Sequence, residues 1–186
     1  TGDVNAMIAR TGYTGEDGFE LYVAAPSAPA VWDAVIASGA VPCGLACRDT
    51  LRLEAGMCLY GNDIDEEHTP LEANLGWIVK GTQFIGKSAL DAQRAAGTTR
   101  LLRGLDMIDR GIARHGYPIF DGDGVDAKPI GVVTSGTQSP FVNKAIAMAY
   151  VDKPHTEPGA TVFVDVRGRK LKAVVVKLPF YKRAKG

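Results

Sequence analysis

The chain of 186 residues lacks the features that mark several large classes of protein. Its 21 lysines and arginines balance its 21 aspartates and glutamates, so no overall field draws it to nucleic acid or to an anionic membrane. No apolar run approaches the roughly 18 residues that a membrane helix needs, and the first residues carry neither a basic nor an apolar stretch typical of an export signal. We therefore expect no nucleic-acid partner and no membrane partner.

Cysteine is scarce, with only Cys43, Cys47 and Cys58 in the chain. The number is odd, no CxxC pair occurs and no histidine is spaced to complete a zinc site, which argues against a disulfide framework and a metal centre. A reducing, cytosol-like compartment fits best, and we expect the protein to be cytoplasmic. We expect Cys47 to be buried as a small apolar residue rather than to act as a nucleophile.

Hydrophobic residues make up 46% of the chain and charged residues 23%, a composition typical of a folded globular protein. A chain of this length forms one large domain or two small ones and buries roughly 70% of its unfolded surface. The chain begins with Thr1 and reaches a motif-rich stretch by Arg10. We expect from this that an N-terminal part of the protein is missing.

The first half of the chain has the pattern of mixed α and β structure. Alternating apolar residues predict strands at 4–8 and 19–23 around a glycine-rich turn, and a short apolar run predicts a further strand at 75–80. Apolar residues at helical spacing, followed by glycine, predict helices at 28–38, 45–55 and 87–96.

The pattern of apolar residues along the sequence changes between Gly97 and Arg100. Beyond this point short apolar runs alternate with Gly, Pro and Asp clusters, which is typical of a small β-barrel or sandwich. The runs are 101–105, 130–134, 146–151, 161–166 and 171–178. We predict an α+β fold with two domains, an α+β region over 1–97 and an all-β barrel over 98–186.

The stretch Gly81–Ser88 matches the P-loop pattern and lies between a predicted strand and a predicted helix. Phe84 and Ile85 are poor residues for a phosphate cradle, and no later strand ends in an aspartate that could hold magnesium. A nucleotide hydrolase therefore remains a remote alternative, and a surface helix opening at Lys87 is favoured.

Acidic residues concentrate between Asn62 and His68, but the glycine of a calcium loop is absent. An acidic turn exposed to solvent is the favoured interpretation. His68, His115 and His155 each stand beside turn residues and are predicted to lie on the surface.

The stretch Arg10–Glu20 combines three glycines with Tyr13 and Glu20. Glycines let the backbone approach a flat ligand, a tyrosine offers a stacking face, and a carboxylate can accept two parallel N–H bonds from an aminopyrimidine edge. A simple hairpin in which Tyr13 packs and Glu20 points to water explains the same residues equally well.

Arg48 and Arg52 stand four residues apart, on one side of the predicted helix. Such a pair can hold a carboxylate, or it can pair with Glu20 and orient it. The alternative is pairing on the surface with Asp49 and Glu54.

Taken together, these stretches resemble the aminomethyltransferase, or T-protein, family of the glycine cleavage system. The resemblance runs in family order along almost the whole chain. It is carried by Arg10–Glu20, Gly44–Leu59, Tyr60–Glu66, Thr69–Glu72, Phe84–Lys87, Gly131–Ser139 and Pro179–Tyr181.

The resemblance implies a tetrahydrofolate-dependent transfer. The methylene of an aminomethyl group carried on the lipoyl arm of a partner, the H-protein, passes to folate, and ammonia is released. It also implies that Glu20 contacts the pterin ring, that Arg48 contacts substrate or folate, and that Tyr13 and the C-terminal Tyr181 belong to the same pocket. Trp77 is a further candidate wall of the folate site, with core packing as its alternative.

The N-terminal part of the family, which supplies the catalytic aspartate, has no counterpart here. The resemblance therefore implies an enzyme when the protein is complete, no catalytic residue in this chain, and little activity without the missing N-terminal half. Alternatives on the same scaffold are a non-catalytic folate-binding protein and a folate-dependent demethylase.

Overall fold

The computed structural model describes residues 3–183 and begins with an antiparallel hairpin. Strands β1 (Ala6–Ala9) and β2 (Glu20–Val23) pair in the register Ala6 to Val23, and Arg10 closes the loop between them with two hydrogen bonds to Asp17, of 2.9 and 2.8 Å. Both predicted strands are confirmed. The hairpin therefore holds the glycine-rich loop as an ordered element.

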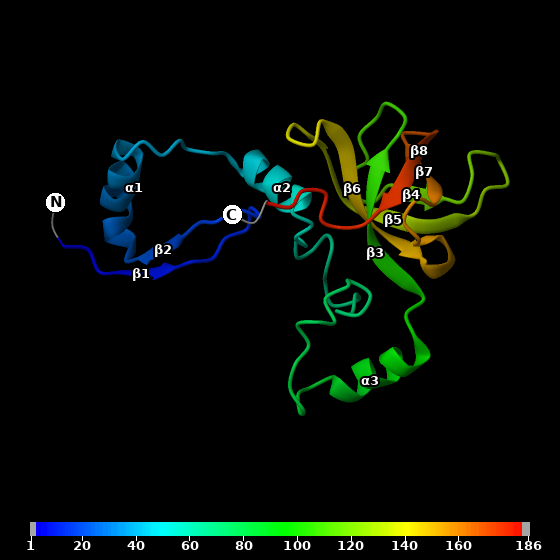
Figure 1. The fold of residues 1–186 in the computed structure, drawn as a ribbon, viewed down its shortest axis with the longest axis horizontal. Helices are drawn as coiled ribbons and strands as arrows, with labels where there is room; N and C mark the ends of the chain where they lie inside the picture. Colours follow the sequence, from blue (N-terminus) through cyan, green and yellow to red (C-terminus); the bar gives the residue numbers. More distant parts are fainter. Residues whose placement is uncertain (1–2, 184–186) are drawn as a thin grey trace.

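Two helices follow the hairpin (Figure 1). The 3-10 helix η1 (Ala25–Ser27) leads into α1 (Ala28–Ala37), and α2 (Leu45–Glu54) follows an extended connection. Helix α2 ends because Gly56 adopts a φ of 66°, a conformation that glycine takes without steric cost, and the Met57 amide then bonds the Arg52 carbonyl at 2.8 Å.

The strand predicted at 75–80 is wrong, because this segment forms turns. The Leu75 amide bonds the Pro70 carbonyl at 2.7 Å and the Ile78 amide bonds the Leu75 carbonyl at 3.0 Å. A short apolar run does not by itself distinguish a strand from a turn whose side chains pack individually. Helix α3 (Lys87–Ala96) is confirmed, but within the described chain no strand directly precedes it, because α2 and then turns come before it. Gly81–Ser88 therefore lacks the setting of a P-loop.

Six antiparallel strands form a closed barrel after α3. They are β3 (Arg100–Met107), β4 (Pro118–Phe120), β5 (Pro129–Ser139), β6 (Lys144–Asp152), β7 (Thr161–Val166) and β8 (Arg169–Val176), with the 3-10 helix η2 (Lys153–His155) after β6. Their order around the barrel is β3-β6-β5-β4-β7-β8. The predicted α+β fold with a small β-barrel is thus confirmed, whereas the short strand β4 was not predicted.

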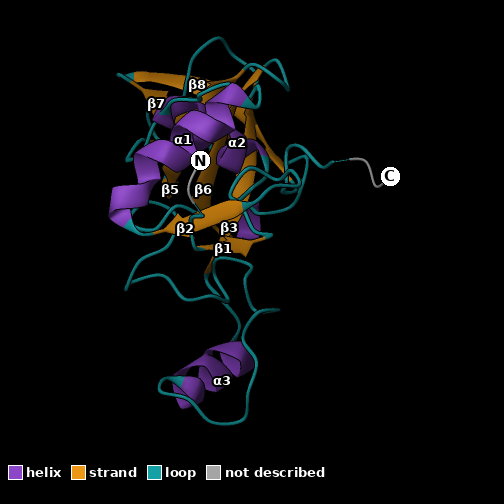
Figure 2. Cartoon of the chain, turned by 90° about the vertical axis from the view of Figure 1, so that its left-hand side faces the viewer, coloured by secondary structure: helices purple, strands orange, loops and turns teal. Residues whose placement is uncertain are grey.

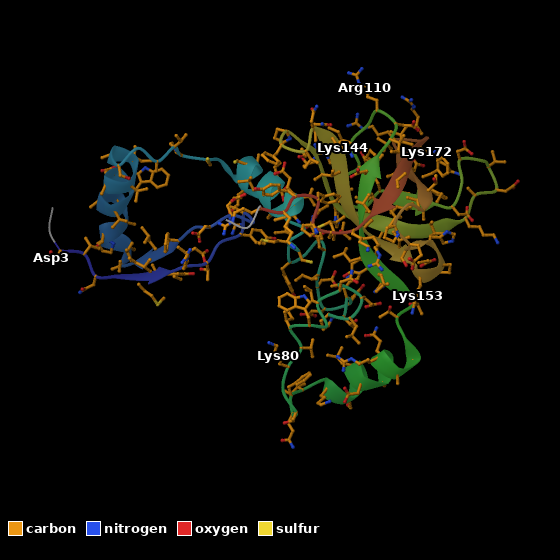
Figure 3. All side chains as sticks on the ribbon, in the orientation of Figure 1. Asp3, Lys80, Arg110, Lys144, Lys153 and Lys172 are labelled. Carbon is orange, nitrogen blue, oxygen red and sulfur yellow. The ribbon has the colours of Figure 1, made fainter. Side chains whose placement is uncertain are left out.

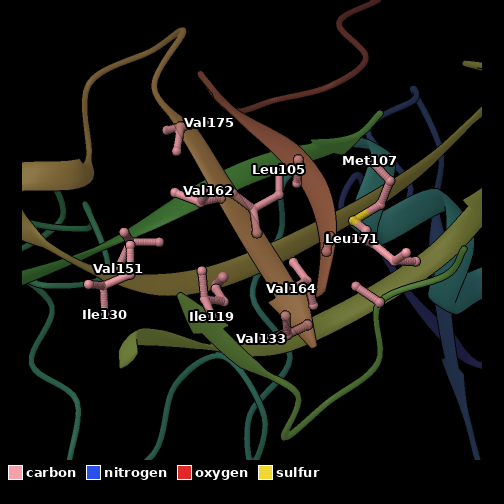
Figure 4. Packing of buried hydrophobic residues seen from close by; sticks show 14 residues of the cluster. Leu105, Met107, Ile119, Ile130, Val133, Val151, Val162, Val164, Leu171 and Val175 are labelled. Carbon is pink, nitrogen blue, oxygen red and sulfur yellow. The ribbon is translucent and has the colours of Figure 1, made fainter. Parts of the chain in front are cut away.

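The barrel is filled by side chains that alternate along each strand, as a closed sheet requires. On β6, Ala147, Ala149 and Val151 point inward and are fully buried. Figure 4 shows how aliphatic residues from all six strands meet in this core. The set includes Leu105, Ile119, Val133, Val162, Val164, Leu171 and Val175.

The outer face of β3 and β6 is also buried, by α2, the segment after it and the C-terminal tail. Ile146, Met148 and Tyr150 of β6 pack there against Leu53 of α2 and Leu102 of β3. This second cluster fixes α2 against the barrel, and α2 carries two of the candidate site residues.

The region before the barrel is open by comparison. No described residue of α1 or α3 is buried. Helix α1 stands apart from the barrel in Figure 1, and α3 stands apart from it in Figures 1 and 2. Figure 3 likewise places Asp3 and Lys80 away from the barrel, which carries Lys144 and Lys172. The division at 97/98 stays a prediction.

Within residues 3–183, no helix is long and apolar enough to cross a membrane. The same residues contain no group of three or more histidine, cysteine, aspartate or glutamate side chains arranged to hold a metal ion.

Candidate functional site

A cavity of about 550 Å³ lies between α2, Tyr13 of the glycine-rich loop and the barrel. Its volume falls within the range of small-molecule sites. Its wall is formed by Tyr13, Leu45, Ala46, Arg48, Asp49, Arg52, Leu59, Asn62, Arg114, His115, Ser135 and Gly136. Two of the predicted site residues, Tyr13 and Arg48, thus share one cavity.

Tyr13 and Arg48 are in direct contact. The Arg48 guanidinium carbon lies 4.6 Å from the centroid of the Tyr13 ring, a cation–π arrangement. The Tyr13 hydroxyl donates to the backbone carbonyl of Cys58, and burial raises the pKa of this hydroxyl. A flat aromatic face and a guanidinium are therefore held together at the cavity wall.

Beneath this pair lies a buried ion pair between Arg52 and Asp63. Arg52 Nη1 is 2.6 Å from Asp63 Oδ2, and the two side chains are 2% and 0% exposed. Burial opposes the charge on Arg52, but Asp63 and Asp49 outweigh it and raise the pKa of the guanidinium. The sequence analysis named Asp49 as a possible partner of Arg52, and the structure confirms that pair. It did not identify Asp63 as a partner.

Asp63 overturns the expectation of a solvated acidic turn. Its carboxylate also accepts bonds from Ser135 Oγ at 2.9 Å and from the Thr134 hydroxyl, both on β5. A carboxylate is buried only when paired and hydrogen-bonded, and here the barrel supplies the partners. The signal available in the sequence was that Asn62-Asp63 and Gly131–Ser139 both belong to the stretches that carry the family resemblance.

The barrel contributes an arginine and a histidine side chain that the sequence analysis did not assign to the site. Arg114 Nη1 donates to the Gly136 carbonyl at 2.9 Å, and His115 Nδ1 lies 3.0 Å from the Thr134 carbonyl. Both residues come from the connection between β3 and β4, and both line the cavity. His115 is exposed, as predicted.

Glu20 stands apart from the cavity, at the start of β2. Its carboxylate accepts a hydrogen bond from the Thr11 hydroxyl within the hairpin. Among the described residues, no ion pair joins Glu20 to Arg48 or Arg52. Of the possibilities that the sequence left open for the helix arginines, pairing with Glu20 is therefore not the one found.

Tyr181 reaches the glycine-rich loop from the C-terminal tail. Its hydroxyl donates to Glu16 Oε1 at 2.5 Å, which raises the pKa of Tyr181, and its ring meets Phe141 edge to face at 4.7 Å. Its amide bonds the Glu54 carbonyl at 2.8 Å, so the tail is fastened to the end of α2. Tyr181 is thus brought to the loop of Tyr13, but it does not line the cavity.

Trp77 lies in a different hollow, a larger cavity of about 830 Å³ between the segment after α2, β3 and the tail. Trp77 is 73% exposed, so the alternative of core packing is wrong. Cys58 lines this second cavity while its neighbour Leu59 lines the first. The 57–59 segment therefore separates Trp77 from Tyr13 and Arg48.

Three further expectations change with the structure. Cys47 is exposed rather than buried, since it lines an open hollow between α2 and the end of β5. His68 is not a surface histidine, since its ring stacks on Tyr150 at 4.2 Å and its Nδ1 lies 2.6 Å from Asp65 Oδ1. Glu54 is buried, and it accepts a hydrogen bond from Ser139 of β5 rather than pairing with an arginine on the surface.

Comparison with known proteins matches the two parts of the chain to two family models. Residues 1–83 match the GCVT N-terminal domain, and residues 100–182 match the glycine cleavage T-protein C-terminal barrel domain. The chain belongs to the glycine cleavage T-protein family.

Curated relatives of this T-protein family member are aminomethyltransferases. The aminomethyltransferase of a Picosynechococcus strain is 51% identical over 97% of this chain and 49% of its own length, and that of Bacteroides fragilis is 52% identical over 97% and 51%. The chain thus spans about half the length of the curated relatives it matches.

A solved T-protein structure has the same fold. The glycine cleavage system aminomethyltransferase T from Bartonella henselae superposes with a TM-score of 0.88 at 39% identity, covering 94% of this chain and 49% of that one. The arrangement of hairpin, helices and barrel is therefore that of a T-protein.

Proposed function

We propose that this chain provides the tetrahydrofolate-binding part and the barrel of an aminomethyltransferase of glycine catabolism. In the proposed reaction the methylene of a lipoyl-bound aminomethyl group passes from the H-protein to tetrahydrofolate, and ammonia is released. The single observation that carries this proposal is the Tyr13–Arg48 pair on the wall of a ligand-sized cavity, in a chain whose curated relatives are aminomethyltransferases.

The residues around the cavity suit a flat anionic ligand such as a folate. Tyr13 offers an aromatic face, and Arg48 and Arg114 supply hydrogen-bond donors, with a positive charge on each arginine. Glu20 remains the proposed pterin contact, because the hydrogen bond from Thr11 leaves its carboxylate with unused acceptor sites. Trp77 and Tyr181 remain proposed contacts at the far side of the 57–59 segment and at the tail.

In the proposed reaction the residues of this chain bind and orient, because transfer depends on holding folate close to the methylene donor. Arg48 and Tyr13 hold the ligand, and the Arg52–Asp63 pair keeps α2 and the following turn in place. We propose that the catalytic carboxylate belongs to the half of the curated relatives that this chain does not match, and that this chain alone turns over little or no substrate.

The exposed apolar residues before the barrel support this view. Met7 and Ile8 of β1, Trp32 of α1 and Leu45 of α2 are between 57% and 80% exposed. Large side chains gathered on uncovered elements mark an interaction surface. We propose that the remainder of a longer polypeptide covers them, within a reducing compartment, the cytoplasm or the mitochondrial matrix, where the three thiols stay free.

A titration with 5-formyltetrahydrofolate, followed by calorimetry, tests the folate site. We expect Arg48→Ala and Glu20→Ala each to weaken binding while leaving the thermal midpoint nearly unchanged. We expect Tyr13→Phe to weaken binding because the ring loses its hydrogen bond to the Cys58 carbonyl. The matched controls are Tyr22→Phe and Arg94→Ala, which alter an exposed tyrosine of β2 and an exposed arginine of α3. Equal affinities for all five variants would remove the assigned residues from the site.

An activity assay tests the reaction. The chain is combined with the half of a curated relative that it does not match, and aminomethylated H-protein and tetrahydrofolate are added. We expect ammonia release from the combination and none from the chain alone. Turnover of a methylated amine in place of the aminomethylated H-protein would support the demethylase instead, and folate binding without turnover of either donor would support the non-catalytic protein.

A further inference from the structure

We propose that Arg52, Asp63 and Ser135 are positioning residues that set the place of the Tyr13 side chain, and through it that of Arg48. The positioning is argued from contacts within this chain. Its consequence for folate affinity rests on the proposed function.

The Arg52–Asp63 pair grips the backbone on both sides of Cys58. Arg52 Nη1 donates to the Met57 carbonyl at 3.2 Å, and Asp63 Oδ2 accepts a hydrogen bond from the Leu59 amide at 2.9 Å. Because residues 57 and 59 are both held, the peptide carbonyl of Cys58 between them has a fixed direction.

That carbonyl is the acceptor for Tyr13. The Tyr13 hydroxyl bonds Cys58 O across 45 positions of sequence, and the Tyr13 ring carries the Arg48 guanidinium on its face. A shift of the 57–59 segment therefore moves the Tyr13 ring, and Arg48 then loses its cation–π contact with that ring.

Ser135 connects this arrangement to the barrel. Its hydroxyl accepts a hydrogen bond from Arg52 Nη2 at 2.8 Å and donates to Asp63 Oδ2 at 2.9 Å. The rigid strand β5 thus holds both members of the ion pair, and it makes no direct contact with Tyr13 through this hydroxyl. A group that acts in this way orients the binding residues through its hydrogen bonds. Because Ser135 also lines the cavity, the Tyr13 side chain itself is the readout that decides its positioning role.

The same strand offers a matched control. Ser139 is also buried on β5 and also bonds a charged residue of α2, since its hydroxyl donates to Glu54 Oε1. Glu54 makes no side-chain hydrogen bond to the 57–59 segment in the described structure. Ser135→Ala and Ser139→Ala therefore remove similar bonds from one interface, but only the first lies on the route to Tyr13.

The experiment uses this chain labelled with 3-fluorotyrosine, with the Tyr13 resonance in the fluorine NMR spectrum assigned by Tyr13→Phe. We expect both alanine variants to lower the thermal midpoint by a similar amount, because each removes one buried hydroxyl. We expect Ser135→Ala to move the Tyr13 resonance toward its position in the unfolded chain, and Ser139→Ala to leave it in place. An unmoved resonance in Ser135→Ala, or equal movement in both variants, overturns the proposal.

Affinity for 5-formyltetrahydrofolate gives the second measurement. Losing the orientation of one binding group that is worth about 1.4 kcal/mol predicts a roughly tenfold weaker Kd for Ser135→Ala, with no change for Ser139→Ala. If the unaltered chain binds no folate, the proposed function fails, while the Tyr13 resonance still decides the positioning. If Ser135→Ala moves the resonance but leaves the Kd unchanged, Tyr13 is positioned as proposed and is not a folate contact.

Discussion

Arg100 of β3 and Glu72 form an ion pair that ties the segment after α2 to the first strand of the barrel. Arg100 Nε lies 2.9 Å from Glu72 Oε1, while the other carboxylate oxygen accepts a hydrogen bond from the Thr69 amide at 2.9 Å. The Glu72 carbonyl also accepts a hydrogen bond from the Leu102 amide at 2.8 Å. One residue therefore connects the turn at 69–74 to the barrel through both its side chain and its backbone.

This pair predicts a loss of stability in acid. Burial alone would raise the pKa of Glu72, but the Thr69 amide and Arg100 outweigh burial and lower it. The stabilisation is therefore fully present above the unfolded-chain pKa of about 4.3 and is lost as the pH falls through the lower folded value. We expect Glu72→Gln to flatten the acid side of a stability–pH curve measured by urea unfolding. Glu67→Gln, at an exposed carboxylate nearby, is the control and should leave the curve unchanged.

Removing the charge of Asp63 should destabilise the chain strongly. Asp63→Asn leaves the Arg52 guanidinium without its buried partner, and breaking such a pair costs about 3–5 kcal/mol. The free energy of unfolding from urea titration measures the loss. Asp65→Asn removes a partly exposed carboxylate from the same turn and should cost much less. Equal losses would mean that the ion pair contributes no more than a surface contact.

Close packing on β5 explains why residue 136 is a glycine, and it predicts the effect of replacing that glycine. A Cβ atom at Gly136 would lie 2.3 Å from the backbone carbonyl oxygen of Ala113, whereas one at Gly124 would meet open space. The contacting atom belongs to the backbone and cannot move aside as the end of a side chain can. We therefore expect Gly136→Ala to lower the free energy of unfolding by about 1–3 kcal/mol. Gly124→Ala should be nearly neutral in the same measurement, and a neutral Gly136→Ala would contradict the packing described.

Cys58 should react slowly with iodoacetamide. Burial raises the pKa of its thiol to about 11, so little thiolate exists at neutral pH. In a chain that keeps only this cysteine, through Cys43→Ser and Cys47→Ser, we expect alkylation near pH 8 to be about tenfold slower than in the same chain unfolded in guanidinium. The rate should rise steeply as the pH approaches the raised pKa. Equal rates in the folded and unfolded chains would place the thiol in open solvent.

Local sequence patterns predicted most of the secondary structure for identifiable reasons. Helix α3 lies at the predicted residues, since glycines stand at both of its ends, and α2 ends where Gly56 permits a positive φ. The barrel strands followed from short apolar runs separated by turn residues. The segment 75–80 failed because its apolar residues are too few to distinguish a strand from a packed turn, and β4 was missed because three residues carry no periodic signal.

The candidate site was predicted in part, and the division has a physical cause. Tyr13 and Arg48 were found because each stands in a stretch with the chemistry to bind a flat ligand. Asp63 and Ser135 were missed as parts of one network, since they are 72 positions apart and meet only when β5 closes into the barrel. Arg114 and His115 were missed for the same reason.

The sequence by itself determined the family, the α+β order followed by a β-barrel, and the residue types that suit a folate. Only the tertiary structure decided that Tyr13 and Arg48 share a cavity, that Trp77 lies in another hollow and that Asp63 is buried rather than solvated. The reason is that composition and periodicity describe the chemistry and local geometry of each segment. Which charges lose their water depends on contacts between distant segments, and these form only when the chain packs.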